Sequence, residues 1–352
     1  MIDWLHERIK TISKIEKYEK PEEGTPFKLD ANENLLLDTA FLSQLVIKEA
    51  KKIDLRKYPF EEYDHLFKKL SGYLNVNSKN IVIGNGSDQI IDLLLSIIGR
   101  GKQLTLFTPT FSYFINRCQL HGLKVNKIPL CSKDNTIRRK LFLNSAKKSN
   151  VVYLCSPNNP TGNQIDKSVV QEILQLKDVL VILDEAYVEF AKYSMSSSIE
   201  KYDNLAVLRT FSKALGLAGC RLGYAVTHKN FANFIRSNVQ SPYPVSSLSL
   251  VIAISLLSNL NTIRKSIAII KKERQRLIES ILNIQYLTAY PSDSNFVFIR
   301  VKHKYEQLIN ALLTHGITVK KLGNLPGYGN CIRITVGTPK MNDATITAIK
   351  SV

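Results

Sequence analysis

Short apolar runs alternate with longer stretches of helical periodicity through the middle of the chain. The runs at 81–83, 104–107, 151–155, 179–183, 205–208 and 222–226 are mostly rich in β-branched residues, which is typical of buried strands. Most of them are far enough apart for a crossover helix to fit between neighbours. This alternation predicts an α/β fold whose central sheet is mostly parallel.

The pattern changes after residue 245. A long helical stretch at 248–282 is apolar at first and then strongly basic, and strands are expected at 296–300 and 331–336 with a helix between them. Residues 1–24 open with a helical pattern and turn polar at KPEEGTP. We therefore predict an N-terminal arm (1–40), a large domain (41–245) and a smaller α+β C-terminal domain (246–352).

Composition and charge narrow the class of protein. The chain has 352 residues and a formal net charge of +18, with the basic residues scattered along its length. This distribution favours an anionic small-molecule substrate over nucleic acid. The five cysteines are odd in number and lack CxxC spacing, which argues against a disulfide framework or a zinc site and indicates a reducing cytoplasm. No apolar run approaches the ~18 residues of a membrane span.

Five chemically unusual loops follow the predicted strands: GNGSDQ, TPTFSY, SPNNPTG, DEAY and TFSK. In open parallel sheets, ligands bind beyond the carboxyl ends of the strands. The loops are therefore expected to form one composite active site.

The last of these loops begins TFSKALGLAGCRLGY (210–224) and contains the principal catalytic candidate, Lys213. Alone, a lysine after a strand would be a surface residue. Here Thr210 and Ser212 precede it and Arg221 follows, and hydroxyls with an arginine suit a phosphate. The lysine amine suits an imine with an aldehyde.

Asp184, in LDEAYVEF, ends an apolar strand, where an unpaired carboxylate would be costly. A pyridinium nitrogen would supply the missing cation, and Tyr187 could bind a ring hydroxyl. The alternative for Asp184 is a helix N-cap. Asn159, in SPNNPTG, could donate to the ring oxygen or simply shape a turn.

The glycine-rich loop would hold an anion at the start of a helix, through backbone N–H groups of Gly86, Ser87 and Asp88. It has neither GxGxxG spacing nor a P-loop ending, which disfavours NAD and ATP. Phe111 could stack on a flat ring or belong to the core.

Taken together, these motifs resemble the fold-type I pyridoxal-phosphate-dependent aminotransferases, and most closely the histidinol-phosphate aminotransferase family. The resemblance covers nearly the whole chain, from FKLDANEN (27–34) and RKYPF (56–60) to SPYPVS, SNFVFIR and CIRITVGT. The block TFSK–GLAG–RLGY is its most diagnostic part.

The resemblance implies pyridoxal 5′-phosphate as the cofactor, a homodimer with shared active sites, and Lys213, Asp184 and Tyr187 as catalytic residues. The implied cofactor-binding residues are Gly86, Ser87, Asp88, Phe111, Asn159, Asp184, Tyr187, Thr210, Ser212, Lys213, Arg221 and, from the neighbouring subunit, Tyr58. The implied substrate-binding residues are Arg333, Lys320, Tyr18, Tyr243 and Asn34.

Three positions depart from the family pattern. Phe111 stands where tyrosine is usual, Gln89 where glutamate is common, and Lys320 where a second anion-binding arginine is expected. Lysine keeps the charge but loses the guanidinium fork.

The resemblance implies a cytoplasmic, ping-pong transamination of L-histidinol phosphate with 2-oxoglutarate, in histidine biosynthesis. An aromatic amino-acid aminotransferase and a lyase similar to threonine-phosphate decarboxylase are alternatives. A non-catalytic basic binding protein is a third alternative, which the joint presence of Lys213, Asp184, Asn159 and Arg221 disfavours.

Overall fold

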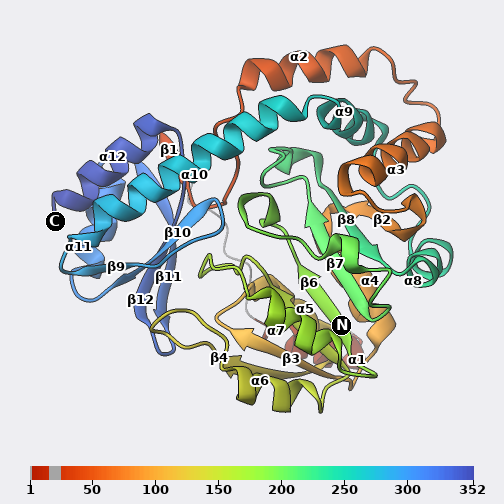
Figure 1. Cartoon of the computed structure of the whole chain (residues 1–352), viewed down its shortest axis with the longest axis horizontal. Helices are drawn as coiled ribbons and strands as arrows, with labels where there is room; N and C mark the ends of the chain where they lie inside the picture. The colour runs from red at the N-terminus through yellow and green to blue at the C-terminus, as the bar shows by residue number, and fades with distance from the viewer. Residues whose placement is uncertain (1, 16–24) are drawn as a thin grey trace.

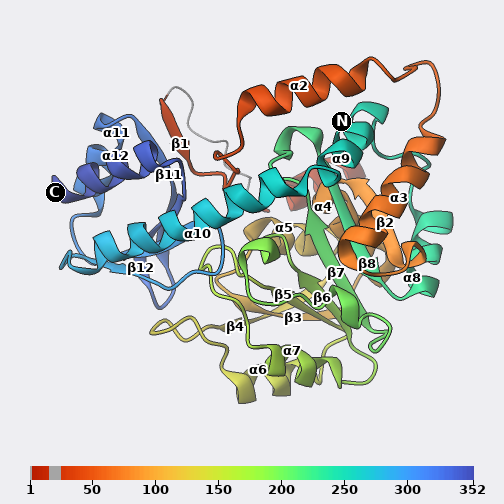
Figure 2. The ribbon, with the colours of Figure 1, turned by 45° about the horizontal axis from the view of Figure 1, so that its top comes forward.

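The structure is a computed structural model that describes residues 2–15 and 25–352. Its larger sheet has seven strands in the order β2-β8-β7-β6-β5-β3-β4 (Figures 1 and 2). They are β2 (Ile81–Asn85), β3 (Gln103–Thr108), β4 (Lys124–Pro129), β5 (Val151–Cys155), β6 (Leu180–Asp184), β7 (Leu205–Thr210) and β8 (Leu222–Thr227). Strands β3 to β7 pair in parallel, whereas β8 runs antiparallel to both of its neighbours. The predicted α/β fold with a mostly parallel sheet is confirmed.

Helices cover both faces of this sheet, as its continuous apolar strands require. One face packs against α4 (Gly86–Ile98), α5 (Ser112–Leu120) and α8 (Lys229–Phe234). The other packs against α2 (Thr39–Ala50), α3 (Phe60–Leu74), α6 (Arg139–Ala146), α7 (Lys167–Leu174) and α9 (Ser247–Leu257). Short 3₁₀ turns occupy Ser78–Asn80, Val188–Phe190, Ser196–Ser198 and Ala218–Cys220, and a π-helical turn occupies Ile235–Val239.

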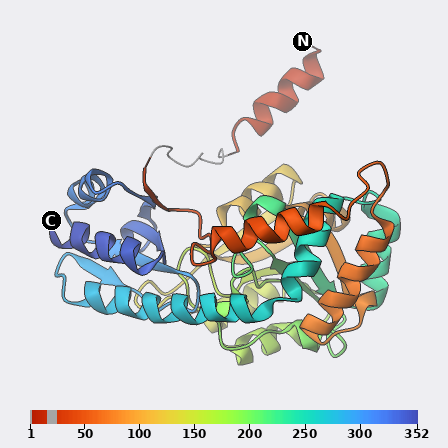
Figure 3. The same cartoon turned by 90° about the horizontal axis from the view of Figure 1, so that it is seen from above.

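A second sheet has five strands in the order β1-β11-β12-β10-β9. They are β1 (Phe27–Leu29), β9 (Leu287–Ala289), β10 (Phe296–Val301), β11 (Ile317–Leu325) and β12 (Gly329–Thr335). Helices α10 (Leu260–Leu282), α11 (Tyr305–Thr314) and α12 (Pro339–Lys350) share its core (Figure 1). Because β1 pairs with β11, the N-terminal part of the chain returns to the C-terminal sheet. Helix α1 (Asp3–Ile12) buries no residue and stands apart from the body in Figure 3.

The structure differs from the sequence prediction in several places, and strands β1, β9 and β11 of the smaller sheet were not predicted. The expected helical stretch at 248–282 is two helices, α9 and α10, which meet at 77° across Ser258 and Asn259. Strand β8 is antiparallel because only the loop 211–221 joins it to β7, with no crossover helix. Strand β4 was not predicted: it lies at the sheet edge, where exposed Lys124 and Lys127 obscure its apolar pattern.

The predicted three-part division, with boundaries at residues 40 and 245, stays a prediction. Helix α9 follows the second boundary in the chain, yet it packs beside α2 and α3 over the larger sheet. Helix α10 then continues into the core of the smaller sheet, so its two ends contact different cores.

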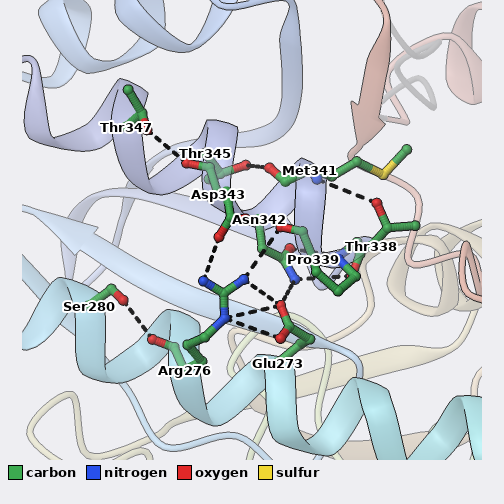
Figure 4. A network of polar contacts seen from close by, with 11 residues as sticks. Glu273, Arg276, Ser280, Thr338, Pro339, Met341, Asn342, Asp343, Thr345 and Thr347 are labelled. Carbon is green, nitrogen blue, oxygen red and sulfur yellow. Dashed lines mark hydrogen bonds and ion pairs between the residues drawn. The ribbon is translucent and has the colours of Figure 1, made fainter.

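A polar network fastens α10 to the first turns of α12 (Figure 4). Buried Glu273 accepts hydrogen bonds from the Arg276 guanidinium and from Asn342 Nδ2, the latter at 2.8 Å. Asn342 Oδ1 in turn accepts from Gly337 N at 3.0 Å. Arg276 also pairs with Asp343 at 2.6 Å. The two helices α10 and α12 are therefore held together by bonded polar groups as well as by apolar packing.

Within the described part of the chain, no single helix has both the length and the apolarity of a membrane span. The bent pair α9–α10 meets those criteria only when its two helices are counted together.

Candidate active site

The carboxyl ends of β5, β6 and β7 meet at one edge of the larger sheet and bring Asn159, Asp184 and Lys213 into one region. Lys213 Nζ donates to Ala31 O at 2.8 Å and lies 5.9 Å from the centroid of the Tyr187 ring. The surrounding protein displaces water from the amine, and this desolvation, followed by the charge of Arg333, lowers the pKa of Lys213 to about 8. With this pKa, a substantial minority of the amine is neutral, and therefore nucleophilic, at physiological pH.

Asp184 is the last residue of β6 and is 4% exposed. Its Oδ2 accepts from Tyr153 OH at 2.8 Å and its Oδ1 accepts from Ala186 N at 3.1 Å. Burial raises the pKa of Asp184 to about 6, against the lowering effect of these two hydrogen bonds. Among the described residues no cation forms an ion pair with it. The alternative role as N-cap of an α-helix is wrong, because a turn and the 3₁₀ segment Val188–Phe190 follow instead.

Tyr187 and Asn159 lie beside this pair and are each held by a residue of another segment. Tyr187 OH accepts from Asn32 Nδ2 at 3.0 Å, and Asn159 Oδ1 accepts from Arg333 Nη1 at 2.5 Å. Asn32 is itself fixed, because its backbone N–H donates to Thr335 Oγ1 at 3.0 Å. Sequence reasoning missed Asn32, although it belongs to the motif FKLDANEN.

A cradle suited to a phosphate lies at the start of α4. Gly86, Ser87 and Asp88 open this helix, so their backbone N–H groups have no acceptor within it. A Cβ added to Gly223 would lie 2.2 Å from Ser87 N, and one added to Gly86, whose φ is +76°, would lie 2.9 Å from Arg221 Nη2. The glycines thus allow two backbone segments and a guanidinium to converge on one small space.

Arg221 and Asp88 form the charged rim of this cradle. They are joined at 3.0 Å between Nη2 and Oδ2, and both side chains are partly exposed. Thr210 and Ser212 stand at the end of β7 and just beyond it, with Ser212 N donating to Thr210 Oγ1 at 3.0 Å. We expect the Asp88 carboxylate to orient the guanidinium, while its backbone N–H faces the anion.

Two departures from the family pattern have clear structural settings. Gln89 Oε1 accepts from Asn85 N at 2.8 Å and so closes the first turn of α4, a task that an amide performs as well as a carboxylate. Phe111 precedes α5, and its ring centroid lies 5.7 Å from that of Tyr113. Its side chain is partly exposed, and its stacking on a planar ligand stays a prediction.

These residues fit the expected pyridoxal 5′-phosphate. A buried carboxylate that only neutral donors contact suits the ring nitrogen, and Tyr187 with Asn159 suits the ring oxygen. The glycine-lined cradle suits the phosphate, and the weakly basic Lys213 amine suits the aldehyde.

The residues expected to bind substrate do not all lie in one place in the structure. Lys320 and Arg333 are direct partners across β11 and β12, so their side chains share a face. Asn34 Nδ2 donates to Ala214 O at 2.8 Å and to Ser266 Oγ at 3.0 Å. Both N–H groups of this amide are therefore used in hydrogen bonds within the protein. Tyr243 stacks on Tyr58 with ring centroids 5.4 Å apart. The expected contribution of Tyr18 lies outside the described residues.

Comparison with known proteins agrees with this geometry. Residues 25–349 match the family described as aminotransferase class I and II. The histidinol-phosphate aminotransferase of Pyrococcus furiosus is 35% identical over 340 residues, which cover 96% of each chain. The crystal structure of the Clostridium acetobutylicum histidinol-phosphate aminotransferase superimposes with a TM-score of 0.84 at 27% identity, covering 92% of this chain and 98% of that one. The Sinorhizobium meliloti histidinol-phosphate aminotransferase, solved with pyridoxal-5′-phosphate, has a TM-score of 0.86 at 23% identity, covers 97% of this chain and 96% of its own, and supports the fold.

Proposed function

This chain belongs to the family of class I and II aminotransferases, and on that premise we propose that it transfers the amino group of L-histidinol phosphate to 2-oxoglutarate in histidine biosynthesis. Full-length relatives at 34–35% identity bear the name of this activity. Pyridoxal 5′-phosphate, when bound, supplies an aldehyde that condenses with amines and a ring that withdraws electrons from the reacting carbon.

The observation that carries this proposal is the environment of Asp184. A carboxylate that is 4% exposed and receives only a phenol and a backbone N–H is incomplete without a cation. A protonated ring nitrogen supplies that cation. The ionised carboxylate then keeps the nitrogen protonated, and this is the condition for efficient electron withdrawal.

Lys213 carries the proton in this reaction. With a pKa lowered to about 8, its neutral Nζ would take a proton from the substrate carbon that bears the amino group and deliver it to C4′ of the cofactor. Tyr187 and Asn159 would hold the ring oxygen of the cofactor. The hydrogen bond from Arg333 to Asn159 links the substrate end of the site to the cofactor end. A Lys213→Ala protein that transaminates at the native rate would rule this assignment out.

The substrate class follows from Lys320 and Arg333. Two cations on neighbouring strands suit a doubly charged phosphate better than a single carboxylate. This is why we prefer histidinol phosphate over an aromatic amino acid as the amino donor.

A half-reaction screen tests the assignment. The holoenzyme is mixed, without keto acid, with histidinol phosphate, histidinol, phenylalanine, tyrosine or threonine phosphate, and the visible absorption of the bound cofactor is followed. We expect the fastest conversion with histidinol phosphate and a large loss with histidinol, which lacks the phosphate. Fastest conversion with phenylalanine or tyrosine would favour the aromatic alternative, and carbon dioxide release from threonine phosphate would favour the lyase.

A matched pair of variants locates the phosphate. Lys320→Met removes the cation that faces Arg333, whereas Lys321→Met removes its exposed neighbour, which points to the other side of the strand. We expect KM for histidinol phosphate to rise in the first variant and to stay near the native value in the second. Equal effects would contradict the role given to Lys320.

We propose in addition that the chain acts as a homodimer whose sites are shared. Leu55, Tyr58 and Phe60 are 81%, 82% and 63% exposed and lie close together in the chain, an unusual concentration of apolar surface. Helix α1 adds exposed Trp4 and Ile9 and buries nothing. A second copy of the chain would cover these groups, and Tyr58 would then reach the partner's cofactor. Sedimentation at micromolar concentration tests this, with Tyr58→Ala expected to weaken cofactor affinity.

Residence in the cytoplasm is likewise a proposal. It is supported by the five cysteines, all of which are free.

A further inference from the structure

Tyr153 occupies the middle of β5 and is fully buried. Its ring stacks on that of Phe114 from α5, with centroids 3.6 Å apart and planes 12° from parallel. Both rings belong to the apolar cluster on the α4/α5 face of the sheet. Packing therefore fixes the ring of Tyr153, and the fixed ring determines the position of its hydroxyl oxygen.

The hydroxyl of Tyr153 contacts the carboxylate of Asp184. Tyr153 pairs with Ile182 in the parallel register, two residues before Asp184 on the same face of β6, and its hydroxyl reaches Asp184 Oδ2 at 2.8 Å. The second carboxylate oxygen accepts from Ala186 N at 3.1 Å. The two donors, one on β5 and one in the turn after β6, thus fix the orientation of the carboxylate and leave its remaining lone pairs for a ligand.

The hydroxyl also affects which form of the carboxyl group is favoured. A hydrogen bond donated to an ionised acceptor is stronger than one between neutral groups, so Tyr153 favours the carboxylate over the carboxylic acid. Burial works in the opposite direction. We infer that Tyr153 is a positioning residue that keeps Asp184 ionised and aimed at the cofactor ring nitrogen, so that the shared proton stays on the ring.

The other groups around Asp184 do not replace this hydroxyl. From α4, the Asp88 carboxylate opposes ionisation, and from the β7–β8 loop, the Lys213 ammonium favours it more weakly than the Tyr153 hydrogen bond does. Cys155 of β5 and Tyr187 of the following turn face it as neutral groups, because burial raises the pKa of both. With these effects together, the pKa of Asp184 is about 6, so loss of one donor would bring it into the physiological range.

The test is Tyr153→Phe, which keeps the ring stacked on Phe114 and removes only the hydroxyl. Apoenzyme is loaded with cofactor labelled with ¹⁵N in the ring, and the nitrogen chemical shift is recorded against pH. We expect the native nitrogen to stay protonated across neutral pH and the variant signal to move toward the unprotonated value. Cofactor affinity of the apoenzyme, measured by fluorescence, should fall about tenfold in the variant, a typical effect of one lost hydrogen bond to a charged group.

Tyr224→Phe is the matched control. Tyr224 is also fully buried, but it lies on β8 and belongs to the cluster on the opposite face of the sheet. Its loss of a hydroxyl should leave the ¹⁵N signal unchanged. If Tyr153→Phe does not fold, 3-fluorotyrosine placed at residue 153, a stronger donor of similar size, should move the loss of ring protonation to higher pH.

A native ¹⁵N titration and native cofactor affinity in Tyr153→Phe would overturn the inference. This inference rests on the proposed function, but the two fail differently. If wild-type apoenzyme takes up no cofactor through Lys213, the proposed function fails. If the wild-type enzyme transaminates and Tyr153→Phe has a native ring-nitrogen signal, only the role of Tyr153 fails.

Discussion

Asp184 and Glu185 are consecutive carboxylates, both buried, and they have opposite surroundings. Glu185 lies on the face of the sheet where Val207 and Tyr224 pack, and Arg209 Nη1 reaches it at 3.1 Å. Arg209 Nη2 also binds Glu189 at 2.7 Å. Asp184 lies on the other face, beside Tyr153, and receives hydrogen bonds only from neutral groups.

We infer from this difference that Glu185 has a structural role and that Asp184 has the functional role proposed above. Glu185 has its cation within the protein and further donors in Ser194 Oγ at 2.6 Å and Met195 N at 2.7 Å. Both of its carboxylate oxygens accept hydrogen bonds, and these bonds fasten the segment after β6 to the end of β7. Asp184 is held in place but not neutralised, so it is ready for a cationic ligand. Burial alone does not identify a functional carboxylate; the source of its counter-charge does.

The largest expected effect is on turnover. Asp184→Asn removes the charge that holds the ring proton, and we expect kcat to fall about 10²–10³-fold, as for other preorganised electrostatic groups. Glu185→Gln should lower stability but leave kcat within about tenfold of the native value, because it lies on the opposite face. Stopped-flow half-reactions measure both variants. Equal losses of kcat in the two variants would contradict the different roles given to Asp184 and Glu185.

The second effect is on stability. Arg209→Met leaves Glu185 and Glu189 buried without their cation, and the free energy of unfolding should fall by about 3–5 kcal/mol. Arg139→Met is the control, since Arg139 pairs with Glu172 at the surface, where the side chains are 55% and 40% exposed. That pair should contribute less than about 1 kcal/mol in urea denaturation. A small loss in Arg209→Met would show that the network is not required for folding.

The third effect depends on pH and concerns the cofactor-free protein. The pKa of Asp184 is raised to about 6 in the fold, above its ordinary value of 3.8, so the fold favours the protonated form. The contribution of protonated Asp184 to the free energy of unfolding is therefore fully present below about pH 4. It is lost as the pH rises through 6. Asp184→Asn should remove this loss, making the variant apoenzyme more stable than wild type at pH 7 by up to about 3 kcal/mol. A pH-independent difference between the two proteins would argue against the raised pKa.

The smallest effect concerns the phosphate cradle at the open end of the site. In Gly223→Ala the new Cβ would meet the backbone of Ser87 and Gly86 at 2.2 and 2.6 Å, which must displace the start of α4. We expect about tenfold weaker cofactor binding, or roughly 1.4 kcal/mol. Gly219→Ala is the control, because nothing lies within 4 Å of its added Cβ. Unchanged affinity in Gly223→Ala would place the phosphate elsewhere.

Much of the site could be predicted because it depends on local sequence and on one rule of topology. Asn159, Asp184 and Lys213 each follow a strand, and the ends of parallel strands meet at one edge. The order of the apolar runs along the chain is therefore enough to predict that these three residues lie together. The same logic predicted most strands of the larger sheet, β8 included, but not the antiparallel direction of β8, which depends on the length of a glycine-rich loop.

The rest depends on contacts between distant segments, which a single sequence does not reveal. Asn32 binds Tyr187 across 155 residues, and nothing local distinguishes it from Asn34, which packs against Ala214 instead. Tyr153 looks like any buried strand residue until its hydroxyl is seen against Asp184. The break between α9 and α10 separates a helix that packs beside α2 and α3 from one that reaches the core of the smaller sheet.

That break has a mechanical consequence. Glu273, which accepts a hydrogen bond from Asn342 of α12, lies 13 residues beyond the first residue of α10, Leu260, or about 20 Å along the helix. A rotation of α10 by about 5° about Ser258–Asn259 would therefore displace Glu273 by nearly 2 Å. Because Glu273 and Arg276 are bonded to α12, we expect a substitution at Ser258 or Asn259 to shift α12 relative to the larger sheet.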